Sequence, residues 1–203
     1  MSGLEGKVVL VTGASSGIGA GAAKSFAALK CRLSLVARNL DNLNSVAEAC
    51  RAAGAAEVLV LSKDLSVAEE CISAVEDTAV HFKGVDVLVN SAGIVVTGDT
   101  ASLPLDDYDR CMNINTRAAF LLSQRAIPHL RKTRGSIVHV SSVTGLRAFP
   151  DVVAYNMSKA AVDQLARTTA LEEAKNGVRV NAVNPGVIVT EIHKRGTECL
   201  SSC

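Results

Sequence analysis

Residues 7–19 read KVVLVTGASSGIG, in which an apolar run leads through a turn of glycine and serine into an Ala-rich segment. A short run of Val and Leu is typical of a strand buried in a parallel sheet. Glycines after such a strand let the backbone approach a pyrophosphate closely, and the N-terminus of the next helix offers free N–H groups to it. The stretch therefore predicts the first strand, phosphate-binding turn and first helix of an α/β domain, with a ligand-free Gly- and Ser-rich loop as the alternative. The residues expected at the phosphates are Gly13, Ser15, Ser16, Gly17, Ile18 and Gly19.

The same alternation of apolar runs and amphipathic segments continues along the chain. Six short apolar runs are expected as strands, at 7–11, 32–36, 57–61, 85–89, 135–141 and 178–183. Five segments of helical period lie between them, at 17–29, 39–53, 66–82, 106–131 and 152–175. Strands that alternate with helices predict a single α/β domain with a doubly wound, Rossmann-type parallel sheet and helices on both faces.

The composition is that of an ordinary globular domain. The chain has 203 residues, 48% of them hydrophobic, and 21 Lys plus Arg against 20 Asp plus Glu. A net charge of +1 gives no electrostatic reason to expect nucleic acid or an anionic membrane surface as a partner, and no apolar run reaches the ~18 residues of a transmembrane helix. Because no secretory leader pattern is present, we expect a cytoplasmic protein whose six scattered cysteines are reduced. The four histidines stand apart without ligand spacing, so no metal is expected.

The end of the second expected strand bears on the choice of cofactor. NAD-binding domains commonly place an acidic residue there, where it hydrogen-bonds to the ribose 2′-hydroxyl. Here Ala37 stands at that place and is followed by Arg38 and Asn39. Arginine pairs with a 2′-phosphate, which a carboxylate would repel. We therefore expect binding of NADP(H) in preference to NAD(H), with a plain surface arginine as the alternative.

Tyr155 and Lys159 are four residues apart in the last expected helix, so their side chains lie on one face. Ser142 ends the fifth strand, at the carboxyl edge where open α/β sheets bind ligands. A phenol with a pKa of about 10 is a poor acid–base catalyst at neutral pH, but a neighbouring ammonium lowers that pKa. Tyr155 could then exchange a proton with a carbonyl oxygen that Ser142 holds, which is the chemistry of a carbonyl reductase or alcohol dehydrogenase.

Together these motifs resemble the short-chain dehydrogenase/reductase family. The resemblance rests on the G-x-x-x-G-x-G turn at 13–19, on Asn90-Ser91-Ala92-Gly93, on Ser142 with Tyr155 and Lys159, and on Pro185-Gly186. It implies a sheet of strand order 3-2-1-4-5-6 and an oxidoreductase that transfers a hydride between NADP(H) and a carbonyl or secondary alcohol. Five apolar positions indicate a lipophilic ketone or 3-oxoacyl substrate, namely Ile94, Val95, Val96, Val143 and Phe149.

The resemblance also implies roles that the residues alone do not suggest. Asn115 would support a proton relay to Lys159, and Asp64 and Leu65 would contact the adenine ring. The further cofactor contacts that it implies are Asn90, Ala92, Gly93, Tyr155, Lys159, Pro185, Gly186, Ile188 and Thr190. It finally implies a homodimer through the helix that carries Tyr155, by an apolar stripe that includes Val162, Leu165 and Ala166.

The last part of the chain differs from the pattern of the family. We expect residues 1–190 to form the NADP-binding domain and 191–203 to form a short polar tail, because the apolar pattern stops near Thr190. Family members usually continue with helices that cover the substrate and with a seventh edge strand, which are expected to be missing here. A catalytically impaired cofactor-binding protein or a shortened isoform is therefore the alternative to an active enzyme.

Overall fold

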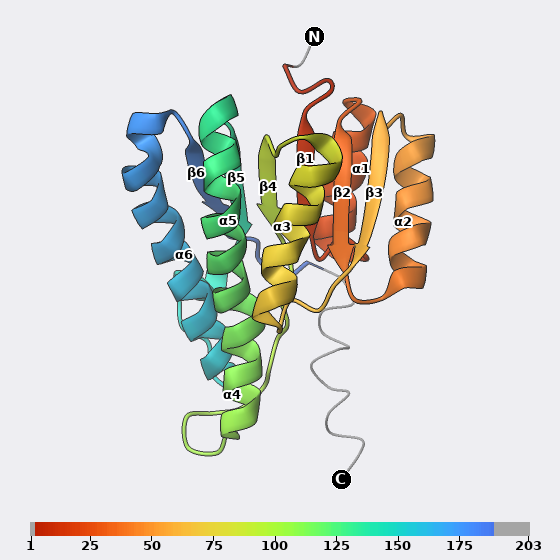
Figure 1. The fold of residues 1–203 in the computed structure, drawn as a ribbon. Helices are drawn as coiled ribbons and strands as arrows, with labels where there is room; N and C mark the ends of the chain where they lie inside the picture. Colours follow the sequence, from red (N-terminus) through yellow and green to blue (C-terminus); the bar gives the residue numbers. More distant parts are fainter. Residues whose placement is uncertain (1–2, 189–203) are drawn as a thin grey trace.

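The computed structural model describes residues 3–188, in which a six-stranded parallel sheet lies between two layers of helices (Figure 1). The strands are β1 (Val8–Thr12), β2 (Arg32–Ala37), β3 (Glu57–Ser62), β4 (Val87–Asn90), β5 (Ser136–Val140) and β6 (Arg179–Val183). Their order is β3-β2-β1-β4-β5-β6, and every pairing is parallel. The predicted fold class and strand order are confirmed, and each strand begins and ends within two residues of its predicted bounds.

The helices cover both faces of the sheet, as a doubly wound fold requires (Figure 1). On one face lie α1 (Gly17–Ala28) and α2 (Leu40–Ala52). On the other face lie α3 (Ala68–Phe82), α5 (Ala118–Thr133) and α6 (Val153–Glu173). The sheet is therefore buried on two sides, and its ligands must approach at the ends of the strands.

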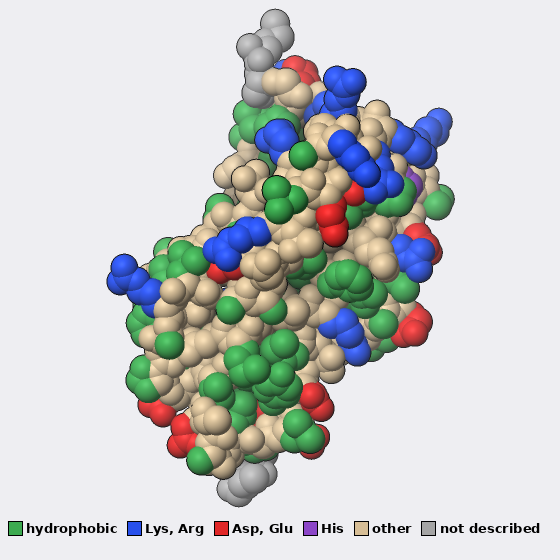
Figure 2. Space-filling view, turned by 90° about the vertical axis from the view of Figure 1, so that its left-hand side faces the viewer, with side chains coloured by type: hydrophobic (Ala, Val, Ile, Leu, Met, Phe, Trp, Pro, Cys, Tyr) green, Lys and Arg blue, Asp and Glu red, His purple; other side chains and the backbone are tan. Residues whose placement is uncertain are grey.

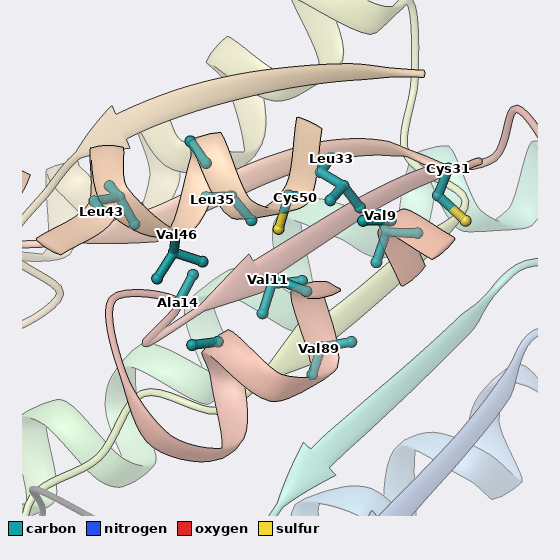
Figure 3. Packing of buried hydrophobic residues seen from close by; sticks show 14 of the residues in the cluster. Val9, Val11, Ala14, Cys31, Leu33, Leu35, Leu43, Val46, Cys50 and Val89 are labelled. Atoms are coloured by element: carbon teal, nitrogen blue, oxygen red, sulfur yellow. The ribbon is translucent and has the colours of Figure 1, made fainter. Parts of the chain in front are cut away.

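β1 is an interior strand and is buried along its whole length. Val9 and Val11 point to the face of α1 and α2, whereas Leu10 points to the other face, because alternate side chains leave a strand on opposite sides. Figure 3 shows the apolar cluster between the sheet and the helices α1 and α2, in which these valines pack with side chains of β2 and α2 such as Leu35 and Leu43. This packing fixes the end of β1 and, with it, the glycine turn that follows.

The prediction of one regular helix over 106–131 is wrong in one respect, because the helical segment is interrupted. α4 (Leu105–Met112) passes into a π-helical turn (Asn113–Arg117) before α5 begins. The side chain of Asn115 leaves this turn, only 2% exposed, to hydrogen-bond with the backbone of Ile94. Single π-helical turns of this kind are frequent at functional sites. Periodicity does not reveal the interruption, since its hydrogen-bond partner lies 21 residues away in the chain.

The apolar stripe predicted for a dimer contact is corrected by the packing of α6. Val162 and Ala166 are 2% and 4% exposed, so they lie inside the protein rather than on its surface. The outer side of the helix carries other apolar residues, including Met157 at 47% and Leu171 at 82% exposure. The spacing of apolar residues in the sequence of α6 predicted an apolar face. Only the fold shows that this face packs inside the protein and is not left on its surface.

The cysteines of the described part are free and buried; they are Cys31, Cys50, Cys71 and Cys111. Burial raises the pKa of each of these thiols, to about 11 at Cys71. They therefore behave as small apolar core side chains. Cys199 and Cys203 lie outside the described residues.

Candidate active site

A large cleft opens at the carboxyl ends of the strands. These ends form the lower edge of the sheet in Figure 1. It has a volume of about 1290 Å³ and is lined by residues that follow each of the six strands. All strand ends of a parallel sheet meet at one edge, so residues distant in sequence converge there. The cleft is large enough for a dinucleotide together with a small substrate.

The glycine turn presents backbone rather than side chains to this cleft. Gly13 has a φ of +64°, and a Cβ atom there would lie 2.8 Å from the Cα atom of Ala92. A Cβ atom on Gly19 would collide with the carbonyl oxygen of Gly13. Neither position can therefore carry a side chain unless the turn moves. The residues predicted at the phosphates all line the cleft, namely Gly13, Ser15, Ser16, Gly17, Ile18 and Gly19.

The first turn of α1 suits a bound anion. The helix begins at Gly17, in the wall of the cleft, and its first turn carries no acidic side chain. Free N–H groups and the positive end of the helix dipole favour negative charge at this place. The local structure therefore supports the predicted pyrophosphate position.

Thr12, which the sequence did not single out, connects the glycine turn to the loop after β4. Its hydroxyl oxygen accepts hydrogen bonds from the N–H groups of Ser91 at 3.1 Å and Ala92 at 3.2 Å. The side chain is fully buried at the end of β1. The sequence indicates only that a polar residue ends an apolar strand. It does not identify the hydrogen-bond partners of Thr12, because they lie about 80 residues away in the chain.

The residues at the ends of β2 and β3 occupy a second region of the cleft wall. Arg38, Asn39, Asp64 and Leu65 all line the cleft. Arg38 is exposed, and within residues 3–188 no carboxylate forms an ion pair with it. Asn39 caps α2 by accepting from a backbone N–H at 2.8 Å, and Asp64 accepts from an N–H two residues on at 2.9 Å. Arg38 is therefore available to a phosphate, while Asn39 and Asp64 also shape their own turns.

Asn90 lies behind the residues that line the cleft, and its implied place among the cofactor contacts stays a prediction. Its side chain is buried, and its amide nitrogen lies 3.3 Å from the hydroxyl oxygen of Ser123 and 3.3 Å from Nδ1 of His139. It thereby links β4 with α5 and β5. Ala92 and Gly93, further along the same motif, do line the cleft.

Ser142, Tyr155 and Lys159 come together in the cleft wall. The Nζ atom of Lys159 lies 5.6 Å from the centre of the Tyr155 ring, one turn away on α6. Ser142 hydrogen-bonds to the side chain of Tyr155. Lys159 is 5% exposed, and its ammonium donates to the carbonyl oxygen of Val140 at 2.8 Å. A phenol, a hydroxyl and a buried ammonium arranged in this way can hold a carbonyl oxygen and deliver a proton to it.

Burial dominates the acid–base properties of these residues. It raises the pKa of Tyr155, against the effect of the hydrogen bond from Ser142. It also lowers the pKa of Lys159 to about 8, although Cys111 and Asp163 act in the opposite direction. The expected lowering of the tyrosine pKa by Lys159 is therefore not seen here, because desolvation of the phenolate, together with the nearby Cys111, outweighs the hydrogen bond from Ser142.

Asn115 lies just behind the cleft and fixes backbone that borders it. Its side-chain amide donates to the carbonyl oxygen of Ile94 at 2.9 Å and accepts from the N–H of the same residue at 2.9 Å. It also donates to the hydroxyl of Ser158 at 3.0 Å. A Cβ atom on Gly93 would lie 3.3 Å from Oδ1 of Asn115 and 3.5 Å from Nζ of Lys159, so the amide and the ammonium are neighbours.

The wall of the cleft around Tyr155 is mainly apolar. Four of the five apolar positions predicted there do line it, namely Ile94, Val95, Val143 and Phe149. The fifth, Val96, is 3% exposed and packs in a cluster with Cys111 and Ala154 instead. After β6 the lining residues include Pro185, Gly186 and Ile188, whereas Thr190 and the tail predicted over 191–203 lie outside the described residues.

Comparison with known proteins decides the family. A family model described as short chain dehydrogenase matches residues 7–199. The chain belongs to this family. A protein named 11-beta-hydroxysteroid dehydrogenase-like 2 from Arabidopsis thaliana is 37% identical over 190 residues, which are 92% of this chain and 61% of that relative.

Solved structures of short-chain dehydrogenases share the fold closely. A levodione reductase superposes with a TM-score of 0.91 at 31% identity, over 98% of this chain and 78% of that one. An NAD⁺-bound xylitol dehydrogenase superposes with a TM-score of 0.87 at 31% identity, over 91% of this chain and 72% of that one. The chain thus spans about three-fifths to four-fifths of the length of these relatives.

Among residues 3–188, no three His, Cys, Asp or Glu side chains gather in a way that could hold a metal ion. In the same part of this short-chain dehydrogenase, no helix has the length and apolar character that crossing a membrane demands.

Proposed function

We propose that this short-chain dehydrogenase is an NADP(H)-dependent oxidoreductase that transfers a hydride between the cofactor and a carbonyl or secondary alcohol of a lipophilic substrate. The observation that carries the proposal is the hydrogen-bonded pair of Ser142 and Tyr155 beside the buried ammonium of Lys159. All three lie in the same cleft as the glycine turn. Acid–base residues and a phosphate site in one cleft are what a nicotinamide-dependent reaction needs.

The residues of the cleft fit a nicotinamide dinucleotide. Gly13 and Gly19 leave room for the pyrophosphate against backbone at the start of α1. Arg38 would pair with a 2′-phosphate, and Lys159 would bind ribose hydroxyls. Gly186, where an added Cβ atom meets nothing within 4 Å, belongs to the loop that would face the nicotinamide. When bound, the cofactor supplies or accepts the hydride.

The protein's own residues would handle the proton and the substrate oxygen. In ketone reduction Tyr155 donates its proton to the carbonyl oxygen, and in alcohol oxidation its phenolate takes the proton back. Ser142 hydrogen-bonds to the same oxygen and stabilises the negative charge that develops on it. The ammonium of Lys159 would favour the phenolate of Tyr155 only against the effect of burial, which raises the pKa of Tyr155 in this structure. The apolar walls around Tyr155 would keep water away from the reaction.

The test is turnover of NADPH by the purified protein with a panel of lipophilic ketones and 3-oxoacyl esters. Loss of absorbance at the nicotinamide band in the presence of a ketone supports the proposal. Tight NADPH binding without turnover of any member of the panel would support the alternative, a catalytically impaired cofactor-binding protein. Absence of both binding and turnover contradicts both hypotheses.

The preference for NADP(H) rests on Arg38. We expect the substitution Arg38→Asp to lower the ratio of kcat/KM for NADPH to that for NADH by about 10–100-fold, the factor that corresponds to one charge-assisted phosphate contact. Arg125→Asp, at an exposed position of α5, makes the same change of charge away from the cleft and serves as the control. An unchanged ratio in Arg38→Asp would refute the argument for NADP(H).

We also propose a homodimer through the outer side of α6. Figure 2 views the side of the molecule on which α6 and β6 lie, and hydrophobic side chains gather on the lower half of this face. Exposed apolar residues of the two helices α5 and α6 include Phe120 and Met157, each 47% exposed. Light scattering is expected to give the mass of a dimer that Met157→Lys weakens. A stable tetramer or a monomer of the unaltered protein contradicts this.

A further inference from the structure

One buried acid in the site has no part in the mechanism above. Asp163 lies on α6 one turn beyond Lys159 and is 3% exposed. Tyr155, Lys159 and Asp163 follow one another at intervals of four residues, so they lie along one face of the helix. Burying a carboxylate is unfavourable unless hydrogen bonds or charges compensate it. Its partners therefore indicate what it does.

Among residues 3–188, the carboxylate of Asp163 hydrogen-bonds to a single side-chain amide. Nδ2 of Asn184 lies 3.0 Å from each carboxylate oxygen of Asp163 and donates to the carbonyl oxygen of Ser142 at 2.9 Å. Within residues 3–188, no Lys or Arg forms an ion pair with this carboxylate. Asn184 thus joins α6 to the residue that carries the catalytic hydroxyl.

The same contact lies where three segments of the cleft wall meet. The N–H of Val143 donates to the carbonyl oxygen of Pro185 at 3.0 Å, so the segment after β5 is tied to the loop after β6. A Cβ atom on Gly145 would collide with Oδ2 of Asp163 and would lie 2.9 Å from the carbonyl oxygen of Lys159. The short turn Val143–Gly145 therefore packs directly against α6 and leaves no room for a side chain at Gly145.

We propose that Asp163 is a positioning residue that orients Asn184, and through it holds Ser142 and the loop from Pro185 to Ile188 in register with Tyr155 and Lys159. This inference rests on the proposed function, because it assigns importance to the place of Ser142. Misplacement of a reacting group by about 1 Å can lower a rate by about 10²-fold. Asp163 would affect the reaction without touching the substrate.

The test compares two replacements of Asp163. Asp163→Asn keeps an oxygen that accepts from Asn184, whereas Asp163→Leu has a similar volume and no acceptor. We expect Asp163→Leu to lower kcat for ketone reduction at least about tenfold with a change of less than about threefold in the Kd for NADPH, and Asp163→Asn to retain most of the rate. Gln164→Leu, at the exposed neighbouring position, is the control. Equal loss in both variants would show that the charge acts directly on Lys159, and would overturn the proposal.

A second measurement needs no turnover. The hydrogen-exchange rate of the Val143 backbone amide in the cofactor-free protein is expected to rise about tenfold or more in Asp163→Leu. The backbone amide of Ser136, which donates to the carbonyl oxygen of Asp86 at 3.0 Å, is the control and should exchange at an unchanged rate. Asn184→Ala should reproduce both the loss of kcat and the faster exchange of the Val143 amide, and it provides the test if Asp163→Leu fails to fold. The double variant should lose no more activity than either single variant. Unchanged exchange at Val143 in Asn184→Ala contradicts the proposal. If the unaltered protein reduces no ketone, the proposed function fails, and the exchange data alone still decide whether Asp163 holds these segments.

Discussion

Replacing Tyr155 by Phe is expected to lower kcat for ketone reduction by about 10²–10⁴-fold, the range typical for loss of a general acid. The substitution removes only the hydroxyl that hydrogen-bonds with Ser142 and keeps the ring beside Lys159. Binding of NADPH should stay within about threefold, because the glycine turn and Arg38 are untouched. Steady-state rates and a fluorescence titration with NADPH measure the two quantities.

The sequence offers a matched control for this substitution, since Tyr108 is its only other tyrosine. Tyr108 lies on α4 and packs against the apolar cluster that includes Ile94, but unlike Tyr155 it does not line the cleft. Tyr108→Phe preserves that packing and is expected to leave kcat unchanged. Equal activity of Tyr155→Phe and the unaltered protein would mean that another group transfers the proton.

Replacing Asn115 by Leu is expected to lower both stability and activity. It leaves the N–H and carbonyl group of Ile94 without their 2.9 Å partners in a buried place, which costs about 1–3 kcal/mol for each group. The free energy of unfolding should therefore fall by about 2–6 kcal/mol. Because this amide adjoins Lys159 and the loop after β4, we also expect kcat to fall at least about tenfold.

Asn113, two residues earlier in the same π-helical turn, provides the control. Asn113→Leu makes the same chemical change at a half-buried position and is expected to alter the free energy of unfolding by less than about 1 kcal/mol. Urea denaturation followed by circular dichroism measures both variants. Similar losses in the two would show that the π-helical turn, and not the bond to Ile94, is what Asn115 supports.

Much of the site could be predicted because it depends on local pattern. The glycine turn needs residues without Cβ atoms at fixed intervals after a buried strand, and Tyr155 and Lys159 need only the pitch of one helix. Both signals lie within about ten residues of sequence. The strands could be predicted equally well, because a strand covered by helices on both faces of the sheet is apolar along its whole length.

The side chains that were missed or misplaced depend on distant partners. Thr12 bonds to residues about 80 positions away, and Asp163 bonds to Asn184, 21 positions on. Asn90 belongs to a motif associated with the cofactor, yet its amide turns inward to Ser123 and His139. Val162 illustrates the same point, because an apolar stripe does not tell which neighbour it packs against.

The sequence by itself thus determined the fold class, the place of the glycine turn and the pairing of Tyr155 with Lys159, because each follows from local periodicity or from the connection rules of α/β domains. The strand order was implied by the resemblance to the family. Only the tertiary structure decided which polar side chains face the cleft, where the helix before α5 is interrupted, and how Asp163 joins α6 to the loops that carry Ser142 and Pro185. Those features are hydrogen bonds between segments that meet only after the sheet has formed, so no single stretch of the chain contains them.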